Sequence, residues 1–379
     1  MQPIYLDNAA STRVSDEVLA LMTEVMRTAW GNPSAAHPQG AAARAFLDTA
    51  RTRMLAALGD RGIGDVVWTS GCSEANALAV LGAARTHEGS IVISTLEHPA
   101  ITTLADRLEA EGRRVVRVAP GPGGVLDPDE LAAASKGAGV VAFLGVQNEI
   151  GVVQPVAAIA QAVRAVAPSA HLHLDAAQAL GKVVLDVAQL GVDSIAIAGH
   201  KLHGPKGAGA LWLRNGARIE PLWVGGGQQH GMRGGTQDAP GAAGLGLAAE
   251  RAATALTTAR ARWLELAANV TQTLEARGIA FRQLVPDHRR APHILALGIA
   301  GIPAGALRNV LASRGVYIST GSACSADGVK ASPTLAAIGL PEDHGMVRLS
   351  FALDTTTDDV ARAATILADV ASELGKRPS

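Results

Sequence analysis

Three short apolar runs of this 379-residue chain each end near a residue that could take part in chemistry. The turn Ser70-Gly71-Cys72-Ser73 leads into a helical stretch, Asp175 follows the run 171–174, and Lys201 follows the run 194–197. Free N–H groups at a helix start bind anions such as phosphate. A carboxylate at the carboxyl edge of a sheet can pair with a protonated ring nitrogen, and a lysine amine can form a Schiff base. Together these groups match the phosphate, ring nitrogen and aldehyde of pyridoxal phosphate.

Each feature taken alone has a simpler interpretation. Ser70 or Ser73 could merely cap the helix that follows, and an arbitrary lysine is most often solvated at the surface. His171 and His173 suggest a metal site, but one strand face supplies only two ligands, so packed or hydrogen-bonded histidines are favoured. The chain has no Walker motif, and no G-x-G-x-x-G opens a helix at its first strand, which argues against a nucleotide site.

A cysteine is the fourth candidate. Cys324 lies in Ile318-Ser319-Thr320-Gly321-Ser322-Ala323-Cys324-Ser325, directly after a predicted strand. A lone cysteine is usually a buried, inert apolar residue. Here the flanking Ser, Gly and Ala residues instead predict an accessible loop on which a thiol can react.

Short apolar runs alternate with long alanine-rich stretches along the chain, and this alternation predicts the strands and helices that position these residues. This alternation is typical of strands joined by helical crossovers in a mostly parallel sheet. Seven candidate strands lie at 65–68, 90–94, 114–118, 140–144, 171–174, 194–197 and 208–213. We predict an α/β fold whose large domain contains one mostly parallel seven-stranded sheet.

The pattern changes after a long helical run at 245–277. Three short strand patterns follow, at 293–297, 316–319 and 347–351. A closing amphipathic helix comes next, with Thr357 as its predicted N-cap. We predict a large cofactor-binding domain of residues 16–255 and a smaller α+β domain formed by residues 1–15 and 256–379, which carries the cysteine loop.

Composition limits the partners. The 33 Lys+Arg and 34 Asp+Glu leave a formal charge of -1, which argues against nucleic acid and anionic membranes as partners. The two cysteines cannot form a disulfide scaffold, and the N-terminal residues lack the pattern of a signal peptide. No apolar run is long enough to cross a membrane. The sequence therefore predicts a soluble, cytoplasmic protein with no membrane or nucleic-acid partner.

At this point nine segments together resemble the cysteine desulfurases of the NifS/IscS group, which are class V aminotransferases of the fold-type I pyridoxal phosphate enzymes. They occur in the family's order and span nearly the whole chain. The segments are Tyr5-Leu6-Asp7-Asn8-Ala9-Ala10, Gly31-Asn32-Pro33-Ser34 with His37 and Gly40, Thr69-Ser70-Gly71, Glu97-His98, Asn148-Glu149-Ile150-Gly151, Asp175-Ala176-Ala177-Gln178, Gly199-His200-Lys201 with Gly204-Pro205-Lys206-Gly207, Gly225-Gly226-Gly227-Gln228, and Gly321-Ser322-Ala323-Cys324.

The resemblance implies a role for each matched residue. Lys201 would carry pyridoxal phosphate as a Schiff base and later move the substrate Cα proton. His98 would stack on the ring and act as acid and base, Asp175 would pair with the ring nitrogen, and Gln178 would bond the phenolic oxygen. The phosphate contacts implied are Cys72, Ser73, His200 and, from the other subunit of a homodimer, Thr236. The implied contacts to the substrate carboxylate are Asn148, which also belongs to the cofactor site, and Arg348.

The implied reaction is removal of sulfur from L-cysteine, which yields L-alanine and a persulfide on Cys324 for transfer to a protein acceptor. An iron–sulfur scaffold is one class of acceptor, and the sequence leaves its identity open. A selenocysteine lyase or aminotransferase of the same family remains the alternative, as does a non-catalytic scaffold subunit that binds the cofactor. One departure from the family is Ala198, where a serine usually donates to the phosphate, so reduced cofactor affinity is expected.

Overall fold

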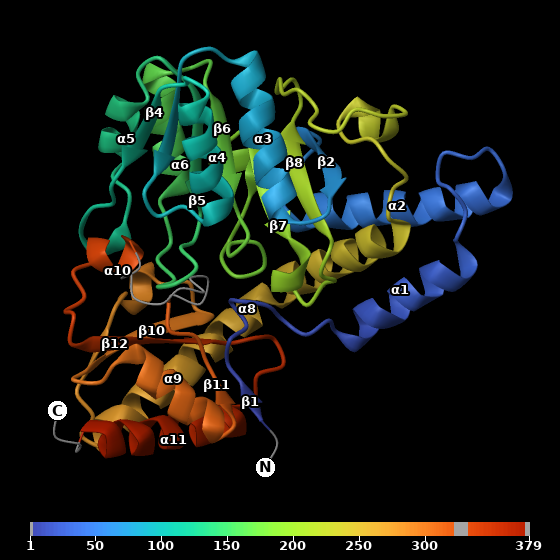
Figure 1. Cartoon of the computed structure of the whole chain (residues 1–379). Helices are drawn as coiled ribbons and strands as arrows, with labels where there is room; N and C mark the ends of the chain where they lie inside the picture. Colours follow the sequence, from blue (N-terminus) through green and yellow to red (C-terminus); the bar gives the residue numbers. More distant parts are fainter. Residues whose placement is uncertain (1–2, 322–332, 376–379) are drawn as a thin grey trace.

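A large mixed sheet dominates the computed structural model, which describes residues 3–321 and 333–375 (Figure 1). Its seven strands lie in the order β2-β8-β7-β6-β5-β3-β4, and only β8 runs antiparallel to its neighbours. The strands are β2 Gly64–Thr69, β3 Ser90–Ser94, β4 Val115–Val118, β5 Ala138–Leu144, β6 His171–Asp175, β7 Ser194–Ala198 and β8 Gly209–Arg214. The predicted α/β class and seven-stranded, mostly parallel sheet are therefore confirmed.

Helices cover both faces of this sheet. The helices before the smaller sheet are α1 Asp16–Thr28, α2 Pro38–Ala57, α3 Cys72–Thr86, α4 Pro99–Ala110, α5 Pro128–Ala134, α6 Val156–Val166, α7 Val187–Leu190 and α8 Ala239–Ala276. Short 3-10 turns occur at η1 Pro122–Gly124, η2 Gly199–Lys201, η3 Gln228–Gly231 and η4 Asp287–Arg289. Buried residues of α3 and α4 pack with one face of the sheet, whereas α2, α6 and α8 pack with the other.

The alternation of side chains along β6 decides which face each residue meets. Leu172 and Leu174 belong to the core with α6 and α8. Because successive strand residues point to opposite faces, His171, His173 and Asp175 point toward α3. Polar groups on β6 thus share one face of the sheet.

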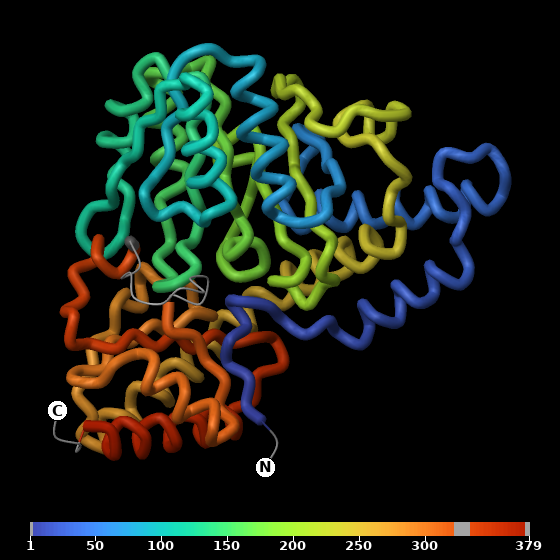
Figure 2. The backbone as a smooth tube through the Cα atoms, in the orientation of Figure 1, coloured from blue at the N-terminus to red at the C-terminus, as the bar shows by residue number. Residues whose placement is uncertain are grey.

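A second group of elements follows at the carboxyl-terminal end of the chain. Its members are β9 Phe281–Gln283, β10 Ile294–Ala300, α9 Ala304–Ser313, β11 Val316–Tyr317, α10 Pro333–Ala337, β12 His344–Ser350 and α11 Thr357–Gly375. Strands β12, β10 and β9 form an antiparallel sheet, while β11 pairs in parallel with the N-terminal strand β1 Ile4–Tyr5. The N-terminal segment therefore runs between the two halves of the molecule (Figure 2).

Helix α8 links two hydrophobic cores. Ala252 packs in the core of the large sheet, and Ala259, about two turns further along, packs in the core of the smaller elements. The predicted domain boundary at 255/256 falls inside this unbroken helix. The division into two domains stays a prediction.

The cap of the closing helix differs from the prediction. The Asp359 N–H donates to Oγ1 of Thr356 at 3.1 Å, and the Thr356 hydroxyl donates to the Asp359 carboxylate at 2.7 Å. Thr356 is therefore the N-cap and Thr357 is the first helical residue. Three consecutive threonines, at 355–357, precede Asp358, and the hydrogen bonds of Thr356 identify which of them is the cap.

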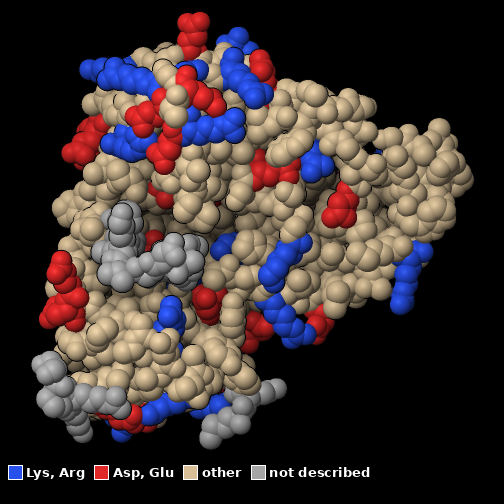
Figure 3. All heavy atoms as spheres, viewed as in Figure 1, with Lys and Arg blue, Asp and Glu red and all other residues tan. Residues whose placement is uncertain are grey.

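Charged side chains of both signs are interspersed near β4 and α4 (Figure 3). Arg117 pairs with Asp106 at 2.6 Å and with Glu109 at 2.8 Å. No helix of the described residues is long and apolar enough to cross a lipid bilayer.

Candidate active site

Lys201 is the last residue of the 3-10 turn η2, which directly follows the end of β7. Its Nζ donates to the carbonyl oxygens of Ala9 at 2.6 Å and Ala10 at 2.8 Å. Burial, reinforced by the nearby Arg348 guanidinium, lowers the pKa of Lys201 to about 8. The amine is thus far more easily deprotonated than a solvated lysine, as nucleophilic use requires.

Asp175 ends β6 at the same edge of the sheet and is only 7% exposed. Its Oδ1 accepts the Ala177 N–H at 2.9 Å and lies 3.6 Å from Sγ of Cys72. Its Oδ2 accepts from Nδ2 of Asn76 at 2.8 Å. These donors fix the orientation of the carboxylate, which can face a protonated ring nitrogen.

Cys72 and Ser73 begin helix α3. The N-cap is Gly71, which has no side-chain capping bond, so the simpler interpretation that Ser70 or Ser73 caps this helix is wrong. The first-turn N–H groups therefore remain available for an anion. Burial and the neighbouring Asp175 carboxylate raise the pKa of the Cys72 thiol well above its usual value, so this thiol is protonated.

His98 is the N-cap of α4, and its Nδ1 accepts the Ala100 N–H at 3.1 Å. The neutral ring therefore carries its proton on Nε2. Partial desolvation lowers the pKa of His98, and the ring also interacts electrostatically with Asp175 and Lys201. The structure thus brings His98, Asp175 and Lys201 into one electrostatic neighbourhood.

Gln178 is a buried residue that shares a hydrogen-bond acceptor with Lys201. Its Nε2 donates at 2.8 Å to the carbonyl of Ala9, which also accepts from Lys201, and its Oε1 lies 3.2 Å from Nε2 of His293. One amide hydrogen of Gln178 remains for a further acceptor.

His200 precedes Lys201, and its Nδ1 lies 3.3 Å from Oγ of Ser11. Burial and the positive charges of Lys201 and Lys206 lower the pKa of His200 to about 4. The ring is therefore neutral at physiological pH and can offer one N–H to an anion.

Thr236 is exposed and lines a small hollow of about 90 Å³ together with Ser70 and Gly209 of the same chain. Its predicted arrival from a second subunit is not tested by a single chain and stays a prediction.

Arg348 is a buried residue of β12 that reaches across to the large sheet. Its Nη2 donates to Oδ1 of Asp7 at 2.6 Å and its Nη1 to the main-chain oxygen of Asn148 at 2.7 Å. Nε is buried without a hydrogen-bond partner among residues 3–321 and 333–375. Asn148 thus contacts Arg348 through its backbone oxygen, and its expected role toward the cofactor and the substrate carboxylate stays a prediction.

Cys324 lies outside the described residues, so its predicted accessible loop stays a prediction. Of the histidine pair on β6, His171 lies 2.7 Å and His173 2.8 Å from Oγ of Ser194, and the hydrogen-bonded interpretation is confirmed. No group of three or more His, Cys, Asp or Glu side chains in the described part of the chain could hold a metal ion.

Sequence reasoning did not assign roles to Asn76, Asp7 or Glu97. Asn76 contacts Asp175, Asp7 contacts Arg348, and Glu97 is buried with its pKa raised to about 8, chiefly by burial. Asn76 follows Cys72 by four residues and therefore lies on the same side of α3, which is the signal that could have indicated it.

Comparisons with known proteins agree with this geometry. Residues 4–363 match the family described as aminotransferase class-V. A cysteine desulfurase of Rhodobacter capsulatus is 38% identical over 381 residues, which cover 99% of this chain and 98% of the relative. A solved NifS-like protein superposes with a TM-score of 0.90 at 30% identity, covering 98% of this chain and 100% of the other. A structure described as SspA in complex with cysteine has a TM-score of 0.78 at 29% identity, with coverage of 92% and 98%. With the lysine, the carboxylate and the helix start gathered at one sheet edge, the chain belongs to the class-V aminotransferase family, in its group of cysteine desulfurases.

Proposed function

We propose that this protein is a pyridoxal phosphate-dependent cysteine desulfurase that converts L-cysteine to L-alanine and holds the released sulfur as a persulfide on Cys324. The main support for this proposal is that Lys201 is mostly buried, has its pKa lowered to about 8 and interacts electrostatically with Asp175. Within the described residues, the hydrogen bonds found for its Nζ go to two backbone carbonyls.

The residues present fit pyridoxal phosphate. The start of α3 at Gly71 leaves N–H groups for a phosphate, Asp175 offers a buried, hydrogen-bonded carboxylate for a ring nitrogen, and Lys201 offers an amine. Buried Ala198, at the end of β7, has no hydroxyl to offer the phosphate. When bound, the cofactor supplies an electron-accepting ring that weakens bonds at the substrate Cα and Cβ.

Residues of the protein would bind the cofactor and transfer protons. Lys201 would hold the cofactor covalently and move the proton at the substrate Cα, and His98 would exchange a proton through Nε2. Gln178 would donate to the phenolic oxygen. The phosphate would be held by Cys72, Ser73 and His200, together with Thr236 of the partner subunit.

Arg348 would bind the substrate carboxylate through N–H groups that Asp7 and Asn148 leave unused, because its guanidinium carries five donors in a fixed fork. The Cys324 thiolate would then attack the substrate sulfur. A bond would form between the two sulfur atoms while the Cβ–S bond breaks and leaves its electron pair on the carbon side. Protonation at Cβ and return of the Cα proton by Lys201 would then complete alanine.

A product assay tests this proposal. The purified protein is loaded with pyridoxal phosphate and given L-cysteine, and we expect alanine and transferable sulfur in equal amounts, with the extra sulfur mass on the peptide that contains Cys324. Cys324→Ala should lose the protein-bound persulfide, whereas Cys72→Ala should keep it on Cys324. Sulfur transfer by Cys324→Ala at the native rate would exclude this nucleophile. A keto acid product would favour an aminotransferase, and binding without turnover a scaffold subunit.

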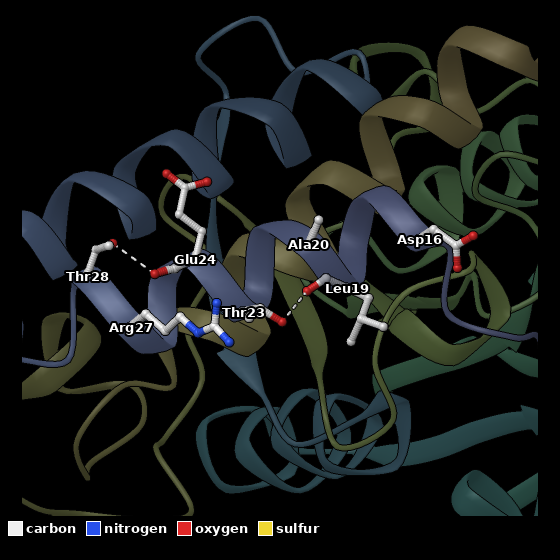
Figure 4. A pocket seen from close by; sticks show the side chains of 7 residues that line it. All are labelled: Asp16, Leu19, Ala20, Thr23, Glu24, Arg27 and Thr28. Atoms are coloured by element: carbon white, nitrogen blue, oxygen red, sulfur yellow. Dashed lines mark hydrogen bonds between the residues drawn. The ribbon is translucent and has the colours of Figure 1, made fainter.

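We further propose that the protein is a homodimer. Large apolar side chains are exposed on α1 and the adjoining segments, with Trp30 71%, Met26 58% and Leu19 56% exposed, as are Trp223 and Val224. Figure 4 shows an exposed side of α1, on which Leu19 and Ala20 lie among polar side chains such as Thr23. Exposed large apolar side chains such as Trp30 and Met26 are typical of a protein interface.

Sedimentation of the holoprotein tests the dimer. We expect a dimer that dissociates when Trp30→Asp and Trp223→Asp are combined. Val184→Asp is the matched control, because Val184 is 75% exposed but belongs to neither segment. A wild-type monomer would contradict the proposal. We also propose a cytoplasmic location and a protein acceptor for the sulfur, which trapping of the acceptor by labelled Cys324 persulfide would identify.

A further inference from the structure

A chain of hydrogen bonds runs from Asp175 into the interior of the large sheet. Nδ2 of Asn76 lies 2.8 Å from Oδ2 of Asp175, and Oδ1 of Asn76 lies 2.9 Å from Nε2 of His173. Nδ1 of His173 lies 2.8 Å from Oγ of Ser194, which in turn lies 2.7 Å from Nε2 of His171. All five side chains are buried, with between 0% and 7% of their surface exposed.

The direction of every proton in this chain is fixed by its first member. The Asp175 carboxylate only accepts, so Asn76 must present its NH₂ group to Asp175 and its oxygen to His173. His173 then carries its proton on Nε2, and its bare Nδ1 accepts from the Ser194 hydroxyl. Ser194 accepts in turn from Nε2 of His171, so both histidines have the same tautomer.

Neutral histidines are required for this arrangement, because each ring then has one donor and one acceptor. Burial is the main cause that lowers the pKa of His173 to about 3 and that of His171 to about 4. Both rings are therefore neutral across the physiological range. The chain cannot reverse without placing two acceptors or two donors against each other inside the protein.

The position of the chain follows from the fold. His171, His173 and Asp175 alternate along β6 and face α3, which supplies Asn76, while Ser194 comes from the adjacent strand β7. Residues 97 positions apart in sequence, Asn76 and His173, thus meet under the proposed cofactor site.

We propose that Asn76 and His173 are positioning residues that hold the Asp175 carboxylate in the orientation in which it accepts a hydrogen bond from the cofactor ring nitrogen, so that the proton stays on that nitrogen. His173 holds the Asn76 oxygen away from Asp175, and Asn76 thereby stays a donor. This role rests on the proposed function, since it concerns the ring that Asp175 would meet.

Histidine tautomers test the chain without the cofactor. Long-range proton–nitrogen NMR spectra of the ¹⁵N-histidine-labelled apoprotein, assigned with His173→Gln and His171→Gln, should show Nε2–H tautomers for both residues. A proton on Nδ1 of His173, or a charged ring, would overturn the inference. If the protein bound no pyridoxal phosphate at all, the proposed function would fail. The apoprotein spectra would still show whether the protons on His171 and His173 are placed as the hydrogen-bond chain requires.

The nitrogen resonance of ¹⁵N-labelled pyridoxal phosphate bound to the protein tests the consequence. In Asn76→Leu and His173→Leu the ring-nitrogen signal should shift toward that of an unprotonated ring, and His173→Gln should restore it, because a glutamine amide can donate to Asn76. His171→Leu is the matched control. It removes a side chain that is just as buried, at the far end of the chain, so it should cost comparable stability with a much smaller shift. A folded Asn76→Leu protein with an unshifted ring nitrogen would overturn the proposal.

Discussion

Sγ of Cys72 lies 3.6 Å from Oδ1 of Asp175, so the thiol is a hydrogen-bond donor to the carboxylate. Burial and this negative charge raise the pKa of the thiol well above its ordinary range. Since the thiolate is the reactive form, we predict that Cys72 resists alkylation in the native protein. Native protein treated with iodoacetamide should carry one label, on Cys324, and unfolded protein should carry two. A label on Cys72 in the native protein would show that the thiol is accessible and ionised.

Lys201 should give the apoprotein a steep pH dependence in cofactor capture. Its folded-state pKa is about 8, so the neutral, nucleophilic amine is the minor form below that pH and the major form above it. We predict that the rate of covalent uptake of pyridoxal phosphate rises about tenfold for each pH unit up to about pH 8 and then levels off. Stopped-flow absorbance measures the rate. A rise that continues to about pH 10 would mean that Lys201 is solvated like a free lysine.

The edge of the sheet where Lys201 and Asp175 meet could be predicted from the sequence. Both residues end apolar runs, and the carboxyl ends of neighbouring parallel strands lie at one edge. The strands themselves were predictable because buried runs of β-branched and aliphatic residues are short and flanked by turn residues.

The contacts made by side chains at that edge were not predictable. Whether Cys72 turns toward Asp175 depends on the direction of the first turn of α3, and whether Asn148 uses its side chain or its carbonyl depends on the path of its loop. Pairing of β11 with β1 also joins segments about three hundred residues apart, which local periodicity does not report.

Arg348 should control the affinity for the substrate more than the rate of the chemical step. Replacement by lysine removes the planar fork but keeps the charge, and a lost charge-assisted hydrogen bond is worth about 1.5–3 kcal/mol. We therefore predict that Arg348→Lys raises the KM for L-cysteine about 10–100-fold with a smaller change in kcat.

Asp7→Asn serves as the comparison for Arg348→Lys. The amide keeps the shape of Asp7 and an acceptor for Nη2, at 2.6 Å in the native protein, but loses its charge. We expect a smaller rise in KM from this variant. An unchanged KM in folded Arg348→Lys would remove Arg348 from the substrate site.

Glu97 should reduce the stability of the protein as the pH rises. Its Oε1 accepts from the Ser94 hydroxyl and from the Leu144 N–H at 3.0 Å, while its buried Oε2 has no hydrogen-bond partner in the described part of the chain. Burial, with a further contribution from Asp175, raises the pKa of Glu97 to about 8. In the unfolded chain the same group ionises near pH ~4.3, so between these two values the unfolded state binds fewer protons than the folded state. The free energy of unfolding therefore falls as the pH rises through this window and is no longer changed by Glu97 above about pH 8.

The isosteric variant Glu97→Gln removes this titration. We predict that it is more stable than the native protein by about 2–4 kcal/mol near neutral pH and that the difference disappears near pH ~4. Urea unfolding of both proteins at matched protein concentration across this pH range measures the difference, and all other titrating groups cancel because they are common to both. A difference that does not change with pH would mean that Glu97 is ionised in the folded protein. In that case the Oε2 atom must have a charged or solvent partner.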